Sequence, residues 1–393
     1  MVYIDVSKLE RKMAGLKQNT ECKLLYIFDH LDWKSRMPVA LGAKNDGYDI
    51  TIGIVGAEEN IEGLNKFQVK TVPKPQKKFG PISVLSTILS LRTLIRNNNP
   101  NLLHTVTLKY SFLVGLACLG ISPLPRIYTI AGLGFLFRSE GTKPKIIRAV
   151  LSPILKLVLK NKNATIIFQN PDDRDLLIQL NYVRKEQTRL VISSGVDLEK
   201  FIPGAIPNEG LPIVLMPTRL VHEKGVAIFV KAAKNLRAKG IKARYQIAGG
   251  LTAHNPRAIS KTEMEDMVSD GTVEWLGRVE DMPALLQSAS IIVYPSYYGE
   301  GVPRVTIEAL AAGRPVITTD HPGCKEVIPK NENGILIPVK DVKATEDAME
   351  KLLSDKDLRE KMGKKSRELA ERSFDVNQIV HQTLNIYASA LNE

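Results

Sequence analysis

Two glutamates in one short segment are the residues of this sequence whose type and spacing most directly suggest chemistry. In SIIVYPSYYGEGVPRVTIEAL, Glu300 follows an apolar run typical of a strand, and Glu308 lies inside the helix that Pro303 is suited to open. The amino end of that helix would present free backbone N–H groups, which attract a phosphate or pyrophosphate. The segment therefore predicts two carboxylates in one cleft, beside a site for a phosphorylated ligand.

A second strand-to-helix turn, PTRLVHEKGV at 217–226, brings two cations into the same kind of position. Arg219 can offer a planar fork to phosphate oxygens, and Lys224 can offer a point charge. Each charged side chain taken alone could be a helix cap or a solvated surface charge. Because both motifs lie at similar turns of one domain, the functional interpretation is the stronger one.

These turns require parallel sheets, and strand-like runs alternate with helical periods along the whole chain. One series of strands is predicted at 23–29, 49–55, 101–105, 126–130, 164–169 and 189–193, and a second at 212–217, 244–249, 272–277, 290–295, 314–319 and 334–338. The Pro- and Gly-rich stretch 203–212 separates them as a linker. We expect an α/β protein with two doubly wound domains facing a central cleft, with ligands at the carboxyl ends of the strands.

The expected domains are 1–202 and 203–373. The sequence predicts an amphipathic basic helix at residues 1–20, which could lie on a membrane surface or dock on its own domain. Residues 374–393 have a helical period and could pack back across the domains.

The charge of the chain is divided unevenly between its halves. Residues 1–200 hold 29 lysines and arginines against 17 aspartates and glutamates, whereas residues 201–393 hold 25 of each, so the whole net charge of +12 lies in the first half. A basic half predicts nucleic acid, an anionic membrane or a phosphorylated substrate as partner, unless it is simply a solvated face. Because no aromatic stacking motif is interleaved in the basic runs, we expect no nucleic acid.

Length and composition exclude several other classes. With 393 residues, 44% of them hydrophobic, the chain suggests two or three globular domains. Cys22, Cys118 and Cys324 are too far apart for a disulfide framework or a metal knuckle, which favours a reducing compartment. The start of the chain lacks the apolar core of a secretory signal, and no window is apolar enough for a spanning helix, so we expect a cytosolic protein. Six scattered histidines predict no metal site.

The pairing of TRLVHEKGV with EGVPRVTIE resembles the retaining glycosyltransferases of family 4, which have the two-domain GT-B fold. SSGVDLEKF at 193–201 and EWLGRVEDMPALLQSA at 274–289 are similar to further segments of that family. The resemblance therefore covers the second half almost completely and the first half loosely. AGLGFLF, AGGLTAHNP and HPGCKE look like the branch that extends lipid-linked oligosaccharides for O-antigen or capsule.

This resemblance implies a reaction and a location. A hexose or N-acetylhexosamine would move from a UDP-sugar to a polyprenyl-diphosphate-linked saccharide, with retention of configuration and with no metal or other cofactor. The N-terminal domain would bind the acceptor, and the C-terminal domain would bind the nucleotide sugar. The enzyme would sit peripherally on the inner face of the cell membrane, with its basic half against anionic lipid.

The resemblance also implies roles for the charged residues. Glu300 would hold hydroxyls of the donor sugar, and Glu308 would bind the ribose diol. Arg219 and Lys224 would neutralise the departing diphosphate. Two loops would complete the donor site: Gly277, Arg278 and Val279, whose backbone would contact the base, and Gly301, Val302, Pro303 and Arg304.

On the acceptor side, His104 resembles a family position near the reacting sugar, where it would make polar contacts or handle a proton. The alternative is a core histidine with both ring nitrogens satisfied. Lys109 lies in the same segment and could assist.

One segment departs from the family pattern. The glycine-rich loop that many members have after the first strand is replaced by DHLDWKSRMPVA at 29–40. Arg36 or Lys34 would then contact an anionic acceptor through its side chain. The turn with Gly132 and Gly134 could instead supply flexible backbone near the cleft.

Other function classes stay open. A GT-B-fold sugar-nucleotide epimerase or hydrolase, or a transferase with a soluble acceptor, would use the same fold. A non-catalytic nucleic-acid-binding protein would explain the basic half alone. The sequence suggests no role for His321 or Cys324.

Overall fold

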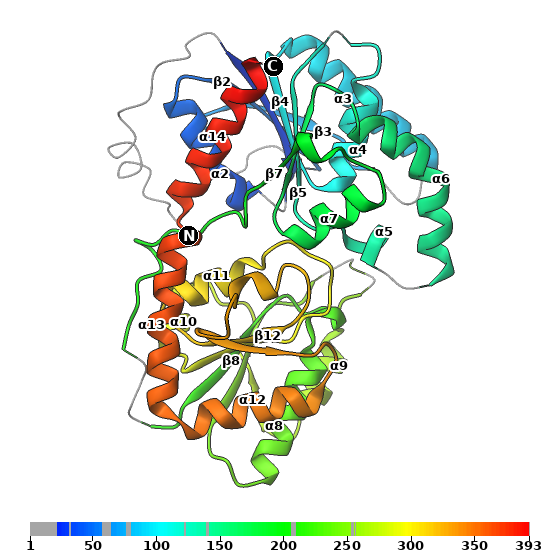
Figure 1. Ribbon diagram of the computed structural model, residues 1–393. Helices are drawn as coiled ribbons and strands as arrows, with labels where there is room; N and C mark the ends of the chain where they lie inside the picture. Colours follow the sequence, from blue (N-terminus) through cyan, green and yellow to red (C-terminus); the bar gives the residue numbers. More distant parts are fainter. Residues whose placement is uncertain are drawn as a thin grey trace. The chain divides into compact units, whose positions relative to one another are not determined.

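The protein forms two compact units in the computed structural model (Figure 1). The structure describes residues 22–30, 33–56, 64–75, 80–121, 123–138, 141–205, 210–252, 255 and 257–392. The N-terminal unit contains the described residues up to Ser194 together with those from Asn377 onward, and the C-terminal unit contains those from Gly195 to Val376. The chain thus leaves the first unit before the stretch 203–212 that we expected to be the linker. The basic helix predicted at 1–20 lies outside the described residues.

The N-terminal unit is built on a seven-stranded parallel sheet with the order β3-β2-β1-β4-β5-β6-β7. Its strands are β1 (Lys23–Asp29), β2 (Asp49–Val55), β3 (Gln68–Val72), β4 (Leu102–Val106), β5 (Arg126–Ile130), β6 (Ala164–Phe168) and β7 (Thr188–Leu190). The sequence predicted all of these except β3. β3 is an edge strand whose first four residues are exposed, so it lacks the apolar run by which the others are recognised.

Helices cover both faces of this sheet (Figure 1). One face carries α2 (Trp33–Asn45) and α14 (Val376–Asn392), and the other carries α3 (Gly80–Asn98), α4 (Leu108–Ala117) and α6 (Thr142–Leu159). The remaining helices of the unit are α5 (Gly134–Arg138), α7 (Pro171–Gln179) and the 3₁₀ turn η3 (Lys185–Gln187). In the described part of the chain, no helix combines the length and apolarity needed to cross a bilayer.

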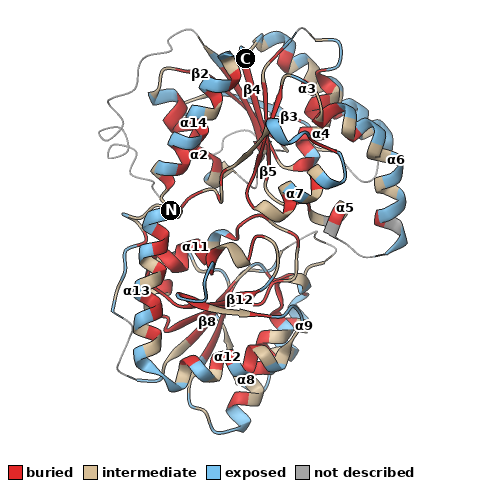
Figure 2. Ribbon diagram, viewed as in Figure 1, coloured by how far each residue is buried: buried red, intermediate tan, exposed pale blue. Residues whose placement is uncertain are grey.

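Two hydrophobic cores result, one on each face of the sheet (Figure 2). Successive side chains of β1 alternate between them, with Leu25 and Ile27 in one core and Tyr26 and Phe28 in the other. A strand buried on both faces reads as a continuous apolar run, which is why the sequence predicts β1 correctly. The C-terminal helix α14 belongs to this unit, because its apolar face completes the second core.

The C-terminal unit contains a six-stranded parallel sheet with the order β10-β9-β8-β11-β12-β13. Its strands are β8 (Ile213–Pro217), β9 (Arg244–Ala248), β10 (Val273–Trp275), β11 (Ile291–Tyr294), β12 (Val316–Thr319) and β13 (Gly334–Ile337). Its helices are α8 (Val226–Ala238), α9 (Lys261–Val268), α10 (Met282–Ser288), α11 (Arg304–Ala311), α12 (Val342–Ser354) and α13 (Lys356–Ser373), with 3₁₀ turns η4 (His222–Lys224) and η5 (Lys325–Val327). The predicted architecture of two parallel-sheet α/β domains is confirmed.

Both sheets reverse their strand order at one point, between β1 and β4 in the N-terminal unit and between β8 and β11 in the C-terminal unit. The chain leaves the two strands of each such pair in opposite directions, which opens a crevice at the carboxyl ends of these strands. Ligands of open α/β sheets bind at such points. The residues that follow these four strands are therefore the first place to look for a site.

Candidate functional site

The charged residues predicted from the sequence meet at the reversal point of the C-terminal unit. β8 and β11 are parallel neighbours. Arg219 and Lys224 follow the carboxyl end of β8, and Glu300 follows that of β11. The fold thereby places the turn that carries Lys224 against the loop that carries Glu300, although the two residues are 76 positions apart in the chain.

Four side chains form a tight cluster there. Lys224 Nζ donates hydrogen bonds of 2.5 Å to both Glu300 Oε1 and the Tyr294 hydroxyl. The hydroxyls of Tyr294 and Ser296 donate to the same Oε1 at 3.1 Å and 3.2 Å. Lys224 is 3% exposed, and a lysine so buried needs an anionic partner. We name these four residues the lysine–glutamate cluster.

The second oxygen of Glu300 has a different environment. Among the described residues, no hydrogen bond reaches Glu300 Oε2, and the side chain is 18% exposed. Because three donors fix Oε1, the carboxylate is oriented without using Oε2. That oxygen can accept a hydrogen bond from a ligand hydroxyl, which fits the predicted contact with a donor sugar.

Two further ionisable groups stay neutral: Tyr294 in the cluster and Cys324, on which the charges of Glu300 and Lys224 act. Burial raises the pKa of the Tyr294 phenol well above its ordinary value, and the charge of Glu300 adds to this, so Tyr294 keeps its proton. Burial also raises the pKa of the Cys324 thiol to about 12. A protonated, buried thiol is neither a nucleophile nor a metal ligand, so the structure gives Cys324 no chemical role.

Two glycines allow the backbone around the cluster to pack closely. Gly225 has a φ of +80° at the start of α8, and a Cβ there would lie 2.3 Å from the carbonyl oxygen of Pro295. Gly323 has a φ of +85°, and its Cβ would lie 2.4 Å from the carbonyl oxygen of Gly301. Any side chain at these positions would push the Lys224 turn and the Glu300 loop away from their neighbours.

Glu308 lies in the second turn of α11, as the sequence predicts, with Pro303 as the residue that caps the helix. It is buried, and Arg304 Nε donates to its Oε1 at 3.0 Å. Burial raises the pKa of Glu308, while the charges of Arg304 and Lys200 oppose that rise. Among the described residues, no hydrogen bond or ion pair joins Glu308 to Glu300, so the two carboxylates can serve different parts of a ligand.

The remaining predicted donor residues lie on loops after the strands or, for Arg304, at the start of α11. Arg219 is exposed, and its charge acts on Tyr294, which places it beside the lysine–glutamate cluster. The loop after β10 is held by a 2.7 Å hydrogen bond from the backbone N–H of Gly249 to the carbonyl of Gly277. Arg278 on that loop is exposed and Val279 is half-buried, whereas Gly301, Val302 and Pro303 are buried and Arg304 is exposed. Their contacts with a nucleotide stay predictions.

In the N-terminal unit, His104 lies on β4, next to Tyr26 of β1. Its Nδ1 is 2.6 Å from the Tyr387 hydroxyl, and its Nε2 is 2.7 Å from Thr129 Oγ1. Burial lowers the pKa of His104 to about 3, with a contribution from the charge of Arg36. Both ring nitrogens are thus hydrogen bonded within the unit, which favours the core histidine that the sequence left as the alternative. A contact of His104 with a sugar or a transferred proton stays a prediction.

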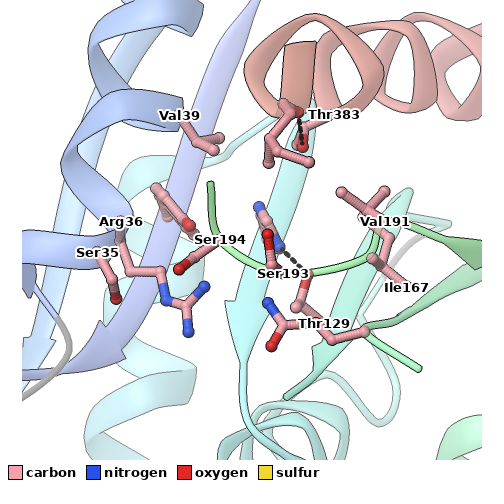
Figure 3. A pocket seen from close by; sticks show the side chains of 13 residues that line it. Ser35, Arg36, Val39, Thr129, Ile167, Val191, Ser193, Ser194 and Thr383 are labelled. Atoms are coloured by element: carbon pink, nitrogen blue, oxygen red, sulfur yellow. Dashed lines mark hydrogen bonds between the residues drawn. The ribbon is translucent and has the colours of Figure 1, made fainter. Parts of the chain in front are cut away.

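A pocket lies in the N-terminal unit between α2, α14 and the sheet (Figure 3). Arg36 of α2 and His104 both line it, so the structure brings together two residues predicted for the acceptor side. Lys34 is exposed on the same helix.

The other predicted acceptor residues do not line this pocket. Lys109 is exposed, with its Nζ 5.0 Å from the centre of the Tyr110 ring. Gly132 and Gly134, between the end of β5 and the start of α5, have φ values of +113° and +51°, which favour glycine. A contact of this turn with the acceptor stays a prediction.

Sequence reasoning missed the hydroxyl groups that orient the charged residues. Tyr294 and Ser296 come just before Glu300, and their position between the strand and the loop was the available signal. Tyr387 could not be recognised as the partner of His104, because the two residues are 283 positions apart in the chain. Among the described residues, the acidic group close enough to hold an ion is Glu346, Asp347 and Glu350, but Lys239 already pairs with two of these carboxylates.

Comparisons with known proteins cover both units. Residues 23–170 match the family described as "Glycosyl transferase 4-like", and residues 199–369 match "Glycosyl transferases group 1". The chain is 28% identical over 367 residues to the N,N'-diacetylbacillosaminyl-diphospho-undecaprenol alpha-1,3-N-acetylgalactosaminyltransferase of Campylobacter jejuni, which covers 90% of this chain and 94% of that protein. It is 25% identical over 328 residues to the UDP-Gal:alpha-D-GlcNAc-diphosphoundecaprenol alpha-1,3-galactosyltransferase of Escherichia coli, covering 80% and 82% of the two chains.

Solved structures share the fold. Sucrose-phosphate synthase from Thermosynechococcus elongatus superposes with a TM-score of 0.79 at 19% identity, over 94% of this chain and 99% of that chain. Alr3699/HepE from Anabaena, in complex with UDP-glucose, superposes with a TM-score of 0.74 at 18% identity, over 93% and 99%. Both sheets are therefore arranged within their units as in these proteins.

Proposed function

We propose a specific reaction for this chain, which belongs to the group 1 and 4-like glycosyl transferases and has the GT-B fold. It moves a hexose or N-acetylhexosamine from a UDP-sugar to a polyprenyl-diphosphate-linked saccharide in bacterial surface polysaccharide biosynthesis, with retention of the anomeric configuration. The observation that carries the proposal is the lysine–glutamate cluster, in which Lys224 is held 2.5 Å from Glu300 at the reversal point of the C-terminal sheet.

The chemistry needs a group that stabilises the leaving diphosphate. The bond between the sugar and UDP breaks as the bond to the acceptor oxygen forms. Negative charge develops on the departing phosphate oxygen, which takes the proton that the acceptor hydroxyl loses. Arg219 and Lys224 supply positive charge at this edge of the sheet, and Lys224 is already fixed before a ligand arrives. Side chains therefore supply the stabilisation, and we propose that no metal or other cofactor takes part.

The two glutamates would hold opposite ends of the donor. Glu300 Oε2 is the oxygen that accepts hydrogen bonds from sugar hydroxyls, because Oε1 is occupied. Glu308 accepts hydrogen bonds from the ribose diol, for which it must be ionised. The loop at Gly277, Arg278 and Val279 contacts the uracil base through its backbone.

The printed names of two relatives support the lipid-linked acceptor. The Campylobacter jejuni and Escherichia coli proteins are both transferases acting on diphosphoundecaprenol-linked sugars, and they align with four fifths or more of this chain. A soluble-acceptor transferase, or a sugar-nucleotide epimerase or hydrolase, is the weaker alternative, because no observation on the site favours it.

Two helices of the N-terminal unit support contact with the membrane. The outward face of α6 carries Ile146, Val150, Ile154 and Leu157, each between 42% and 68% exposed (Figure 2). Neighbouring α3 exposes four more aliphatic residues: Ile82, Val84, Leu85 and Leu89. Both helices pack on α4, so these residues belong to one side of the unit. We name the four residues of α6 the aliphatic stripe.

The charges around the aliphatic stripe suit an anionic bilayer surface. The sequence of α6 contains four basic residues and no acidic one. A helix with an exposed apolar stripe and flanking basic side chains lies in the membrane interface, where lysines and arginines attract anionic lipids. The enzyme would thus hold its N-terminal unit, and the acceptor, against the inner leaflet.

A transfer assay tests the reaction. Purified protein is incubated with a panel of radiolabelled UDP-sugars, with and without lipid-linked oligosaccharide extracted from the source cells, and label is counted in the organic phase. We expect label from one UDP-sugar, and only in the presence of the lipid. Free sugar or an altered UDP-sugar, with no label in the lipid, would support the soluble-substrate alternative instead.

A further inference from the structure

The pocket between α2, α14 and the sheet of the N-terminal unit contains a buried cation. Apolar residues of the sheet and of α14 form part of its wall. Its polar lining comes from α2, from the strands and from the segments after them: Ser35, Arg36, Thr129, Gln169, Ser193 and Ser194. Figure 3 shows the Arg36 side chain extending from α2, with Ser194 beside it and Ser193 nearer the middle of the view.

Arg36 has no counter-ion among the described residues. It is 9% exposed, and its Nε is buried without a hydrogen-bond partner. No aspartate or glutamate lines the pocket. A guanidinium taken out of water without an anion or full hydrogen bonding costs several kcal/mol, and proteins accept such a cost mainly where a ligand compensates it.

The remaining groups of the pocket suit oxygen atoms of an anion. The hydroxyl of Ser194 and the side-chain amide of Gln169 are groups that can donate hydrogen bonds. Ser193 has a φ of +86°, a strained conformation for a residue with a side chain, and it lies three residues after the end of β7. Such strain is concentrated at ligand sites, where the surrounding structure maintains it.

His104 does not compete for the anion. Both of its ring nitrogens are already hydrogen bonded to Tyr387 and Thr129. The imidazole ring is therefore a neutral part of the lining. Among the residues that line the pocket, Arg36 alone carries a charge. One guanidinium with hydroxyl donors is the donor set of a site for a single phosphoryl group.

We propose that this pocket binds a phosphoryl group, and that in the enzyme this group belongs to the diphosphate of the lipid-linked acceptor. The assignment to the acceptor rests on the proposed function. The donor diphosphate has its own cations, Arg219 and Lys224, in the C-terminal unit. Arg36 therefore remains for the other phosphorylated substrate.

A binding experiment tests the pocket without turnover. The melting temperature of the full chain is measured against inorganic phosphate, in the presence of saturating UDP so that the donor site is filled. We expect phosphate to raise the melting temperature of the wild-type protein and of Lys44→Gln, which removes an exposed lysine from the same helix. Arg36→Gln should abolish this rise. An equal rise in Arg36→Gln, or none in the wild-type protein, would overturn the proposal.

A kinetic experiment identifies the source of the phosphoryl group. Arg36→Gln should raise the KM for the lipid-linked acceptor about 10-fold or more, because a charge-assisted contact is lost. The KM for the UDP-sugar should change less than about 2-fold. A raised KM for the UDP-sugar with an unchanged acceptor KM would assign the pocket to the donor and overturn the acceptor assignment.

Folding must be separated from binding, because Arg36 is buried. Arg36→Lys keeps the charge and most of the volume, and we expect it to keep a weakened phosphate effect on the melting temperature. A wild-type protein that responds to phosphate but transfers no sugar to lipid would contradict the proposed function and leave the phosphoryl site standing. A protein that transfers sugar but whose acceptor KM is unchanged in both variants would contradict this inference alone.

Discussion

Lys224 and Glu300 form an ion pair of 2.5 Å that is buried on the side of the lysine and partly open on the side of the glutamate. The two residues come from turns after neighbouring strands, so the pairing of β8 with β11 sets their separation. Three donors converge on one carboxylate oxygen and leave the other for a ligand. Donors and charges arranged before the substrate arrives need not reorganise during the reaction, which is the main source of electrostatic catalysis.

Replacing Glu300 tests this arrangement. Glu300→Gln keeps the size of the side chain but removes the charge that fixes Lys224 and the strongest acceptor for a sugar hydroxyl. We expect kcat to fall about 100-fold or more, in the range seen when an oriented polar group is removed from an active site. The Kd for UDP should stay within about 3-fold, because Arg219 and Glu308 are unchanged. Single-turnover transfer and calorimetric titration with UDP measure the two effects.

A matched variant controls for the lost carboxylate. Glu265→Gln makes the same change on the exposed surface of α9, and it should leave both kcat and the UDP affinity unchanged. Full transfer activity in Glu300→Gln would show that the cluster is structural.

For Glu308 we predict that lowering the pH stabilises the fold but weakens UDP binding. Burial raises its pKa, so in the pH range between the ordinary value near 4.5 and the raised value the folded protein holds a proton that the unfolded chain has released. Lowering the pH through this range therefore stabilises the fold through this residue. It also neutralises the carboxylate that would accept the ribose hydroxyls, so UDP should bind more weakly.

The variant Glu308→Gln separates this effect from the titration of UDP itself. At pH 7.5 it should bind UDP about 10-fold more weakly, the cost of losing hydrogen bonds to a charged group. Between pH 7.5 and 5 its affinity should change only as the phosphate of UDP titrates, whereas the wild-type protein should lose more. If the two affinities ran parallel over this range, Glu308 would not contact the nucleotide.

How much of this site the sequence predicts depends on how far apart in the chain the contacting residues are. Glu300, Lys224 and the strands before them follow from local patterns, because buried parallel strands read as apolar runs and the turns after them carry the charges. β3 was missed because its exposed edge position needs no such run. The contacts of His104 were left open, since its partner Tyr387 lies in the last helix of the chain. A pairing of that kind depends on packing and has no local signature.

His104 itself predicts how stability changes with pH. The folded protein binds a proton at His104 only near pH 3, whereas the unfolded chain binds one near pH 6.5. The unfolded state therefore holds more protons between these values, and stability falls as the pH is lowered through them, by roughly 1.4 kcal/mol per pH unit from this residue. Denaturant unfolding at pH 7 and pH 5 measures the loss.

The substitution His104→Asn removes this titration. It should be less stable than the wild-type protein at pH 7, because Tyr387 and Thr129 lose their partner, but its further loss between pH 7 and pH 5 should be smaller by roughly 2 kcal/mol. Equal slopes in His104→Asn and the wild-type protein would mean that His104 titrates normally.

The aliphatic stripe of α6 predicts binding to anionic vesicles. Isoleucine, valine and leucine side chains that enter the interface gain free energy in proportion to the apolar area they bury. The triple variant Ile146→Ser, Val150→Ser, Leu157→Ser should therefore bind vesicles of phosphatidylglycerol and phosphatidylcholine at least about 10-fold more weakly than the wild-type protein in co-sedimentation at low salt. Its fold should hold, because all three side chains are exposed.

The control removes as many exposed aliphatic residues from the other unit. Ile202→Ser, Leu211→Ser, Val339→Ser changes side chains that are 51%, 49% and 42% exposed, and it should leave vesicle binding unchanged. Raising the salt concentration should weaken wild-type binding as well, because the basic residues of the N-terminal unit act through a screened potential. If both triple variants lost binding equally, the membrane would recognise exposed apolar residues anywhere on the protein. If neither did, charge alone would hold the N-terminal unit to the lipid, and the aliphatic stripe would have no part in it.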